Sequence, residues 1–136
     1  QWLRKEDFTM TIEQIHEEQQ KKLSAMFEEF GVFFAFSKQQ FEQSRKEGVE
    51  YVSGFAGMII PKDNVTLVDE RLDHIHEEAA ALMREHIPME KYILYELYNH
   101  EAFYTGEVDE VLKLARSYYP DCTLDDIYKV YRANNY

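Results

Sequence analysis

The segment 89–104 constrains the fold more than any other part of the chain, because its apolar residues occupy nearly every face of a helix. These residues are Tyr92, Ile93, Leu94, Tyr95, Leu97, Tyr98 and Phe103. Pro88 ends any helix before the segment and favours the start of a new one, and Gly106 is a typical stop after it. A helix that is apolar nearly all round is usually surrounded by other elements. We therefore predict a central helix over residues 89–104.

Helical periodicity also marks the segments on either side of this helix. The other predicted helices are 11–30, a short one that opens at Ser37 and ends before Gly48, 64–87, 108–119, and a last one that opens at Thr123. Capping-box spacing, in which two residues bond each other's backbone at a helix start, occurs in Thr11 with Gln14 and in Ser37 with Gln40. Thr123 with Asp126 opens the last helix in a similar way.

Three short segments between the helices have the composition of strands. Residues 32–36 are aromatic and bounded by Gly31 and Ser37, which is typical of a buried strand. Residues 49–52 alternate as a half-buried strand does, and a turn leads from them into residues 55–60. The direction of the first strand relative to the second is left open by the sequence.

These elements predict an α+β fold that is dominated by helices, with a small inserted sheet of about three strands. We expect one domain over residues 1–136, because the chain is too short for two domains of ordinary size. Within it, residues 1–10 form an N-terminal arm, residues 11–62 a helix plus the small sheet, and residues 63–136 a helical half.

The helical half carries most of the negative charge. Of the formal net charge of −11, residues 63–136 contribute −9, from 16 acidic and 7 basic residues. Such a surface would repel a phosphate backbone, so we expect no direct binding to nucleic acid. A partner protein with a basic surface is the expected complement.

Three further features of the sequence bear on the compartment. Cys122 is the one cysteine, which excludes an internal disulfide and favours a reducing compartment. No apolar run approaches the length of a membrane span, and no secretory signal is recognisable at the start. We expect a cytoplasmic protein that does not contact membranes.

A candidate site lies on the central helix, at Glu96, His100 and Glu101. Glu96 and His100 are four residues apart and share a face of a helix that we expect to be buried. A carboxylate beside an imidazole suits a metal site or a general acid–base pair. The alternative is a solvent-facing stripe, or an internal hydrogen-bond network that anchors the loop at Thr105. Two residues are too few for a metal site, and nothing in the sequence supplies the missing ligands.

Other patterns of metal ligands and catalytic residues are weak. An acid-x-x-His pair occurs as Glu13 with His16 and as Asp73 with His76, and di-iron bundles use such pairs. In a chain with 26 acidic residues, about one such spacing arises by chance. Phosphate loops, nucleophile elbows and zinc motifs are absent from the sequence. We therefore expect no cofactor.

The ten tyrosines, most of them in the acidic half, suggest an interaction surface. Tyrosine joins a large apolar ring to a polar tip and is enriched at protein interfaces. The candidate interaction residues are Asn99, Tyr104, Tyr118, Tyr119, Asp125 and Asp126. The alternative is that most tyrosines belong to the core with their hydroxyls at its rim, which the helical spacing of Tyr118, Tyr128 and Tyr131 favours.

Two stretches together resemble a pattern in small uncharacterised proteins of bacteria and their phages. They are Phe33-Phe34-Ala35-Phe36-Ser37 with Phe41, and Glu96-Leu97 with Asn99-His100-Glu101 and Tyr104-Thr105-Gly106. That family has no assigned activity, so the resemblance supplies no catalytic residues. It implies that Asn99-His100-Glu101 is more than a solvent stripe. It also implies a mobile-element setting, in which small acidic proteins block host nucleases or defence complexes.

Three hypotheses of function follow from these features. The leading one is a non-enzymatic interaction module, encoded by a phage or mobile element, whose acidic half binds a basic surface of a host nuclease or defence protein. The second is a metal-binding or hydrolytic protein with its site around Glu96, His100 and Glu101. The third is a structural subunit whose exposed aromatic residues are buried in a homodimer.

Overall fold

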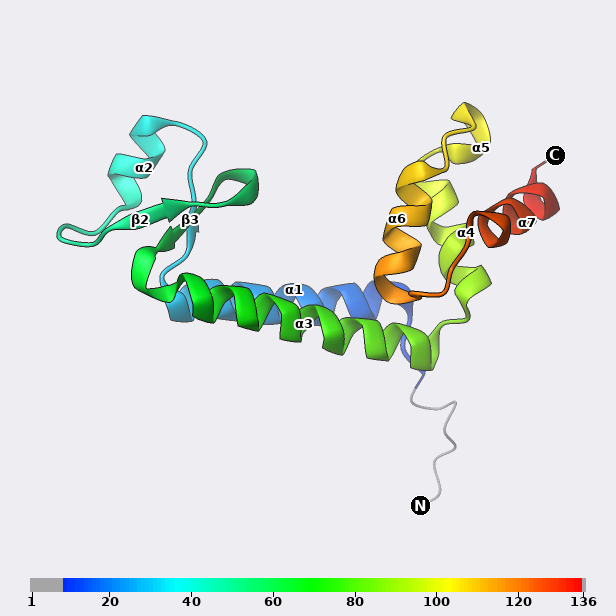
Figure 1. The fold of residues 1–136 in the computed structure, drawn as a ribbon, viewed down its shortest axis with the longest axis horizontal. Coiled ribbons are helices and arrows are strands. Elements are labelled where there is room, and N and C mark those ends of the chain that lie inside the picture. The colour runs from blue at the N-terminus through cyan, green and yellow to red at the C-terminus, as the bar shows by residue number, and fades with distance from the viewer. Residues whose placement is uncertain (1–8, 136) are drawn as a thin grey trace, which may run out of the picture. The chain divides into compact units, whose positions relative to one another are not determined.

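The computed structural model describes residues 9–135 and confirms a helix-dominated α+β fold (Figure 1). Its helices are α1 (Ile12–Phe30), α2 (Lys38–Ser44), α3 (Val65–His86), α4 (Met89–Asn99), α5 (Ala102–Thr105), α6 (Asp109–Tyr118) and α7 (Leu124–Asn134). Its strands are β1 (Phe33–Phe34), β2 (Tyr51–Ser53) and β3 (Met58–Pro61), with 3₁₀ turns at Phe55–Gly57 and Lys62–Asn64. The predicted arm, residues 1–10, lies outside the described residues except for Thr9 and Met10.

The chain forms two compact units. Unit 2 is Glu18–Glu77, and unit 1 holds the described residues up to Glu17 together with those from Glu78 onward. Both α1 and α3 therefore contribute one end to each unit.

Unit 2 contains the small sheet, in the order β1-β3-β2. Both outer strands pair antiparallel with β3, so β1 and β2 run in the same direction, which answers the question that the sequence left open. The pairs Phe34–Met58 and Val52–Ile60 share one face of the sheet. That face contributes Ile60 to a core with Met26 of α1 and Val68 and Ile75 of α3.

The opposite face of the sheet carries a cluster of three aromatic rings. Phe33 of β1 and Tyr51 of β2 lie 5.4 Å apart between ring centroids, and Phe41 of α2 lies within 6.1 Å of both. This contact holds α2 against the sheet. Figure 1 shows α2 beside β2. The short helix that begins at Ser37 therefore has a packing role as well as a capped start.

The prediction of a buried strand over residues 32–36 is wrong in length and in burial. Only Phe33 and Phe34 are strand, and Phe36 is 75% exposed. The reason is the capped start of α2, which follows β1 closely. Gln40 Oε1 accepts a hydrogen bond from the Phe36 amide at 2.6 Å, and Ser37 Oγ accepts one from the Gln40 amide. These bonds direct the chain into α2 at Ser37, so the strand does not continue.

Unit 1 packs around α4, as the apolar pattern of residues 89–104 predicted. α4 contacts both α6 and α7 (Figure 1). The largest buried apolar side chains of this core are Ile15, Met83, Tyr92, Ile93, Leu97, Val111 and Ile127. Cys122 is also buried there, and burial raises the pKa of its thiol, which keeps it in the unreactive protonated form.

The predicted helix starts are confirmed by the hydrogen bonds of two caps. The Thr11 amide donates to Gln14 Oε1 at 2.9 Å, and the Gln14 amide donates back to Thr11 Oγ1. Thr123 and Asp126 form the same reciprocal pair at the start of α7. Leu124, the first residue of α7 after the cap, is exposed.

Gly57 provides a test of how closely the sheet and the Phe36 ring pack. Its φ is +81°, and a Cβ added there would lie 2.5 Å from Phe36 Cε1. Gly57→Ala should therefore destabilise the protein by about 1 to 2 kcal/mol for the left-handed backbone. Displacing the ring should add roughly 0.5 to 1.5 kcal/mol. Urea unfolding measures both terms.

Gly48→Ala is the matched control, because Gly48 has the same φ of +81° but no heavy atom within 4 Å of the added Cβ. It should show only the backbone term. In a Phe36→Ala background the two alanine substitutions should become equal in effect. Equal effects in the wild-type background would contradict the contact between Gly57 and Phe36.

Candidate functional site

The core of unit 1 contains a buried carboxyl group on α4. Glu96 is 5% exposed, and among the described residues it is the charged side chain that lies in the core. A buried carboxylate is stable only when its oxygens are bonded. The environment of Glu96 therefore determines how the end of α4 is arranged.

Three side chains surround the Glu96 carboxyl group, all from α4 or its end. Asn99 Nδ2 donates a hydrogen bond to Glu96 Oε1 at 3.0 Å, and His100 Nε2 lies 3.7 Å from Oε2. The buried Tyr92 hydroxyl is also bonded to Glu96. Burial, and then the negative charge of Glu96, raise the pKa of Tyr92 well above its usual value, so Tyr92 remains a hydrogen-bond donor.

The helix breaks immediately after this network, and the prediction of one helix over residues 89–104 is wrong at this point. α4 ends at Asn99 and α5 begins at Ala102. Glu101, between them, has a φ of +52°, in the left-handed region that Gly or Asn usually occupies. The turn lets Ala102 enter the core, where it is fully buried. Apolar periodicity carries no signal for such a break.

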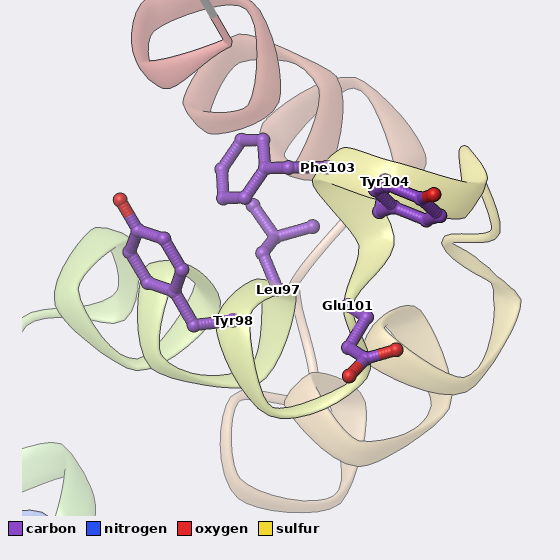
Figure 2. A pocket seen from close by; sticks show the side chains of 5 residues that line it. All are labelled: Leu97, Tyr98, Glu101, Phe103 and Tyr104. Atoms are coloured by element: carbon purple, nitrogen blue, oxygen red, sulfur yellow. The ribbon is translucent and has the colours of Figure 1, made fainter.

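The break separates Glu101 from Glu96 and His100, which the sequence had grouped into one candidate site. Glu96 and His100 remain together at the end of α4, whereas Glu101 lies in the left-handed turn and is one of the residues that line a neighbouring pocket (Figure 2). Within residues 9–135, no group of three or more His, Cys, Asp or Glu side chains is arranged to hold a metal ion. The arrangement around Glu96 is thus a hydrogen-bond network that anchors the end of α4.

The neighbouring pocket has a volume of about 400 Å³ and lies at the α4–α5 break. Its lining residues are Leu97, Tyr98, Glu101, Phe103 and Tyr104. Figure 2 shows Leu97 at the centre, Tyr98 and Phe103 on one side, and Tyr104 and Glu101 on the other. We refer to these five residues as the tyrosine pocket.

The tyrosine pocket leaves two large rings open to water. Tyr98 is 62% exposed and Tyr104 is 93% exposed, although both are large enough to contribute to a core. Phe103 is held in place from behind, since its ring lies 5.1 Å from Tyr98 and stacks on Tyr131 at 5.3 Å. Exposed aromatic rings beside a hollow, next to a carboxylate, are typical of a binding surface.

A comparison with protein families gives the chain a classification. The pattern of DUF7659, a family of unknown function, matches residues 11–133. The chain belongs to this family. No curated protein and no solved structure matches it. The match confirms the resemblance to uncharacterised proteins, and because the function of DUF7659 is unknown, it assigns no role to any residue of the site.

Two tyrosines predicted for the interaction surface lie in the core of this DUF7659 chain. Tyr118 and Tyr119 are 8% and 9% exposed. The Tyr119 hydroxyl donates to the carbonyl oxygens of Ile87 and Met83 at 2.5 and 3.2 Å, and burial raises its pKa to about 12. Tyr118 packs edge-on against Tyr92. Their helical spacing was the signal for this alternative, which the structure supports.

Three of the remaining predicted interaction residues, Asn99, Asp125 and Asp126, have partners in or next to their own helices. Asn99 bonds Glu96, as described above. Asp126 caps α7, and hydrogen bonds from Thr123 lower the pKa of its carboxyl group. Asp125 Oδ2 lies 3.3 Å from Lys129 Nζ in an exposed ion pair. Tyr104 alone of the predicted set lines the tyrosine pocket.

Of the two acid-x-x-His pairs, the first has its histidine packed among aromatic rings. The His16 ring lies near Tyr95 and Tyr118, at 6.1 and 6.3 Å between ring centroids.

None of the helices within the described residues is long and apolar enough to cross a membrane, which agrees with the sequence.

The pocket positions of Leu97, Tyr98 and Phe103 were not predicted, because all three belong to a segment that is apolar nearly all round. Leu97 is indeed in the core and Phe103 packs against it, whereas Tyr98 is exposed. A signal was present in the run Tyr98-Asn99-His100-Glu101, four consecutive residues with polar tips inside that segment. Such a run interrupts the apolar face for a full helical turn.

The buried network predicts a large difference between two acidic residues that are five positions apart. Glu96→Ala removes the partner of the buried Tyr92 hydroxyl and of Asn99, and should lower the free energy of unfolding by about 1 to 3 kcal/mol. Glu101→Gln, at an exposed position, should change it by less than about 0.5 kcal/mol. The midpoint of urea unfolding measures both.

Tyr92→Phe provides the second test of this network. Because the phenylalanine ring needs no acceptor, Glu96→Ala should be less destabilising in a Tyr92→Phe background than in the wild type. Additive effects would show that the two side chains are not coupled.

The left-handed turn predicts that a glycine stabilises the fold at Glu101. Glu101→Gly removes a backbone penalty of about 1 to 2 kcal/mol and adds about 0.5 to 1 kcal/mol of chain entropy. The net expectation is a gain of about 0.5 to 1 kcal/mol in the free energy of unfolding. Glu101→Ala, which keeps the Cβ, is the control and should show no gain. A gain of equal size for alanine would refute the backbone explanation.

Proposed function

We propose that the chain is a protein-interaction module that binds a basic surface of another protein through the tyrosine pocket. The observation that carries this proposal is the exposure of Tyr98 and Tyr104 around a hollow that also holds the Glu101 carboxylate. Large exposed rings in water are unfavourable unless a partner covers them.

The composition of the tyrosine pocket supports a protein partner. Tyrosine is among the residues that contribute most to binding energy at protein interfaces, because it buries a large rigid ring and keeps a polar tip. The walls are also held before binding, since Phe103 stacks on Tyr131 and contacts Tyr98. A wall that does not rearrange loses little conformational entropy when a partner binds.

The charge around the tyrosine pocket supports a basic partner. Glu107 follows the pocket along the chain, and Asp109 and Glu110 form the first turn of α6, all of them exposed. No basic residue lines the pocket. A surface of one sign attracts its complement over about one Debye length and increases the rate of encounter.

The finer form of the proposal concerns the identity of the partner. We place the basic surface on a nucleic-acid-binding protein of a bacterial host, such as a nuclease or a defence protein, with this chain encoded by a phage or mobile element. The support is the net charge of −9 on residues 63–136, since acidic side chains interleaved with tyrosine match a groove that otherwise holds phosphates.

Binding to a fluorescently labelled basic peptide tests the proposal. The affinity, measured by fluorescence anisotropy, should fall at least tenfold between about 50 and 500 mM salt, because the attraction is electrostatic. Tyr104→Ala should weaken binding by a further factor of about 10 to 30, as expected for a central interface tyrosine. An uncharged peptide of the same length should not bind.

Phe55→Ala is the matched control, because Phe55 is 90% exposed but belongs to unit 2 and is not among the residues that line the tyrosine pocket. It should leave the affinity unchanged. Binding that persists unchanged in half-molar salt, or that depends on Phe55 and not on Tyr104, would contradict the proposed function.

A further inference from the structure

We infer that the group bound in the tyrosine pocket is the guanidinium of an arginine side chain on the partner protein. This inference rests on the proposed function, since it names the part of the basic partner that enters the pocket. Three properties of the pocket carry it: flat apolar walls, a single carboxylate among the described lining residues, and a left-handed turn that sets the direction in which that side chain leaves the backbone.

The walls offer ring surfaces to a flat ligand. Figure 2 shows the rings of Tyr98 and Phe103 on one side of Leu97 and the ring of Tyr104 on the other. Leu97 is fully buried, so it closes the inner end of the hollow with hydrocarbon. A guanidinium is planar and weakly hydrated, and it stacks on aromatic rings through its apolar faces.

The single carboxylate of the lining belongs to Glu101. Carboxylates bind the edge of a guanidinium through two parallel hydrogen bonds, which fixes both distance and orientation. The left-handed turn at φ +52° sets the direction of the Glu101 side chain, which a regular helix would direct elsewhere. Unfavourable backbone conformations of this kind concentrate at binding sites.

The same lining fits lysine poorly. An ammonium group is a compact, strongly hydrated charge with three donors, and it needs several acceptors to replace its water. Within the pocket the polar groups are the Glu101 carboxylate and two tyrosine hydroxyls, and most of the remaining surface is apolar. Lysine would therefore lose hydration that the pocket does not restore, whereas arginine would keep both ring stacking and its paired hydrogen bonds.

The geometry of the site is also supported from the core. Asn99, the last residue of α4, bonds the buried Glu96 carboxyl group, and Ala102 on the other side of the turn is buried. The backbone of Glu101 is thus held between two anchored residues. A site whose backbone is already ordered loses less conformational entropy when a ligand binds.

Titration with three short peptides tests the inference. The probes are Ac-Gly-Arg-Gly-NH₂, its lysine analogue, and its citrulline analogue, which keeps the shape of arginine without the charge. The ring resonances of Tyr98 and Tyr104 are followed by NMR in the full chain. Arginine should shift them in a saturable way, with an affinity roughly fivefold or more above that of lysine, and citrulline should bind more weakly still.

Variants of the pocket locate the site. Glu101→Gln should remove the preference for arginine over lysine and citrulline, and Tyr104→Ala should lower the affinity for all three. Glu110→Gln, which removes an exposed acidic residue outside the lining, should keep the preference. Circular dichroism verifies that each variant is folded.

The outcomes separate this inference from the proposed function. Equal affinities for arginine and lysine, or shifts that ignore Glu101, would overturn the arginine assignment, and so would the absence of any shift at Tyr98 and Tyr104. The salt-dependent binding of the longer basic peptide would still decide the proposed function by itself. Loss of that binding together with all three short-peptide signals would overturn both.

Discussion

The arrangement of unit 1 depends on a carboxyl group that is buried in its core. Glu96 lies on the most apolar helix of the chain, where a charge is tolerated only if its oxygens are bonded. Tyr92 bonds it from one turn earlier in α4, and Asn99 bonds it from the last position of the helix. Because Asn99 and Tyr92 both form hydrogen bonds with Glu96, the end of α4 is held in a fixed position against the core.

The turn that follows has two effects at once. It brings Ala102 into the core, and it turns Glu101 and Tyr104 out of it. A continuous helix would have kept the apolar pattern in one straight element, with no pocket beside Tyr98. The backbone of Glu101 costs about 1 to 2 kcal/mol in the left-handed region, and the exposed tyrosine rings forgo the free energy of burial. Both penalties concern residues that line one pocket. This pattern is expected at a site where the choice of residues serves binding at the expense of stability.

Sequence reasoning predicted those features that depend on a few neighbouring residues. The pair Thr123 and Asp126 specifies a cap by itself, and Pro88 stops a helix whatever surrounds it. The fold class followed from such signals. The break at Glu101 did not, because it depends on where Ala102 packs, and a long-range contact leaves no periodic trace. Tyr118 was ambiguous for a related reason: the ring is amphipathic, so spacing alone does not say whether it faces the core or water.

The sequence marked the pocket only indirectly, and the physical reason bears on how the site works. The sequence grouped Glu101 with Glu96 and His100 as candidate ligands, yet the left-handed turn directs His100 and Glu101 to different surroundings. The same turn converts a carboxylate that would have sat on a solvated helix face into one that borders aromatic rings. A planar cation that pairs with this carboxylate would at the same time contact the exposed rings of Tyr98 and Tyr104, which a carboxylate on an open helix face would not offer. The core network at Glu96 and the surface pocket are therefore one structural unit: the buried bonds hold the turn, and the turn gives Glu101 its position.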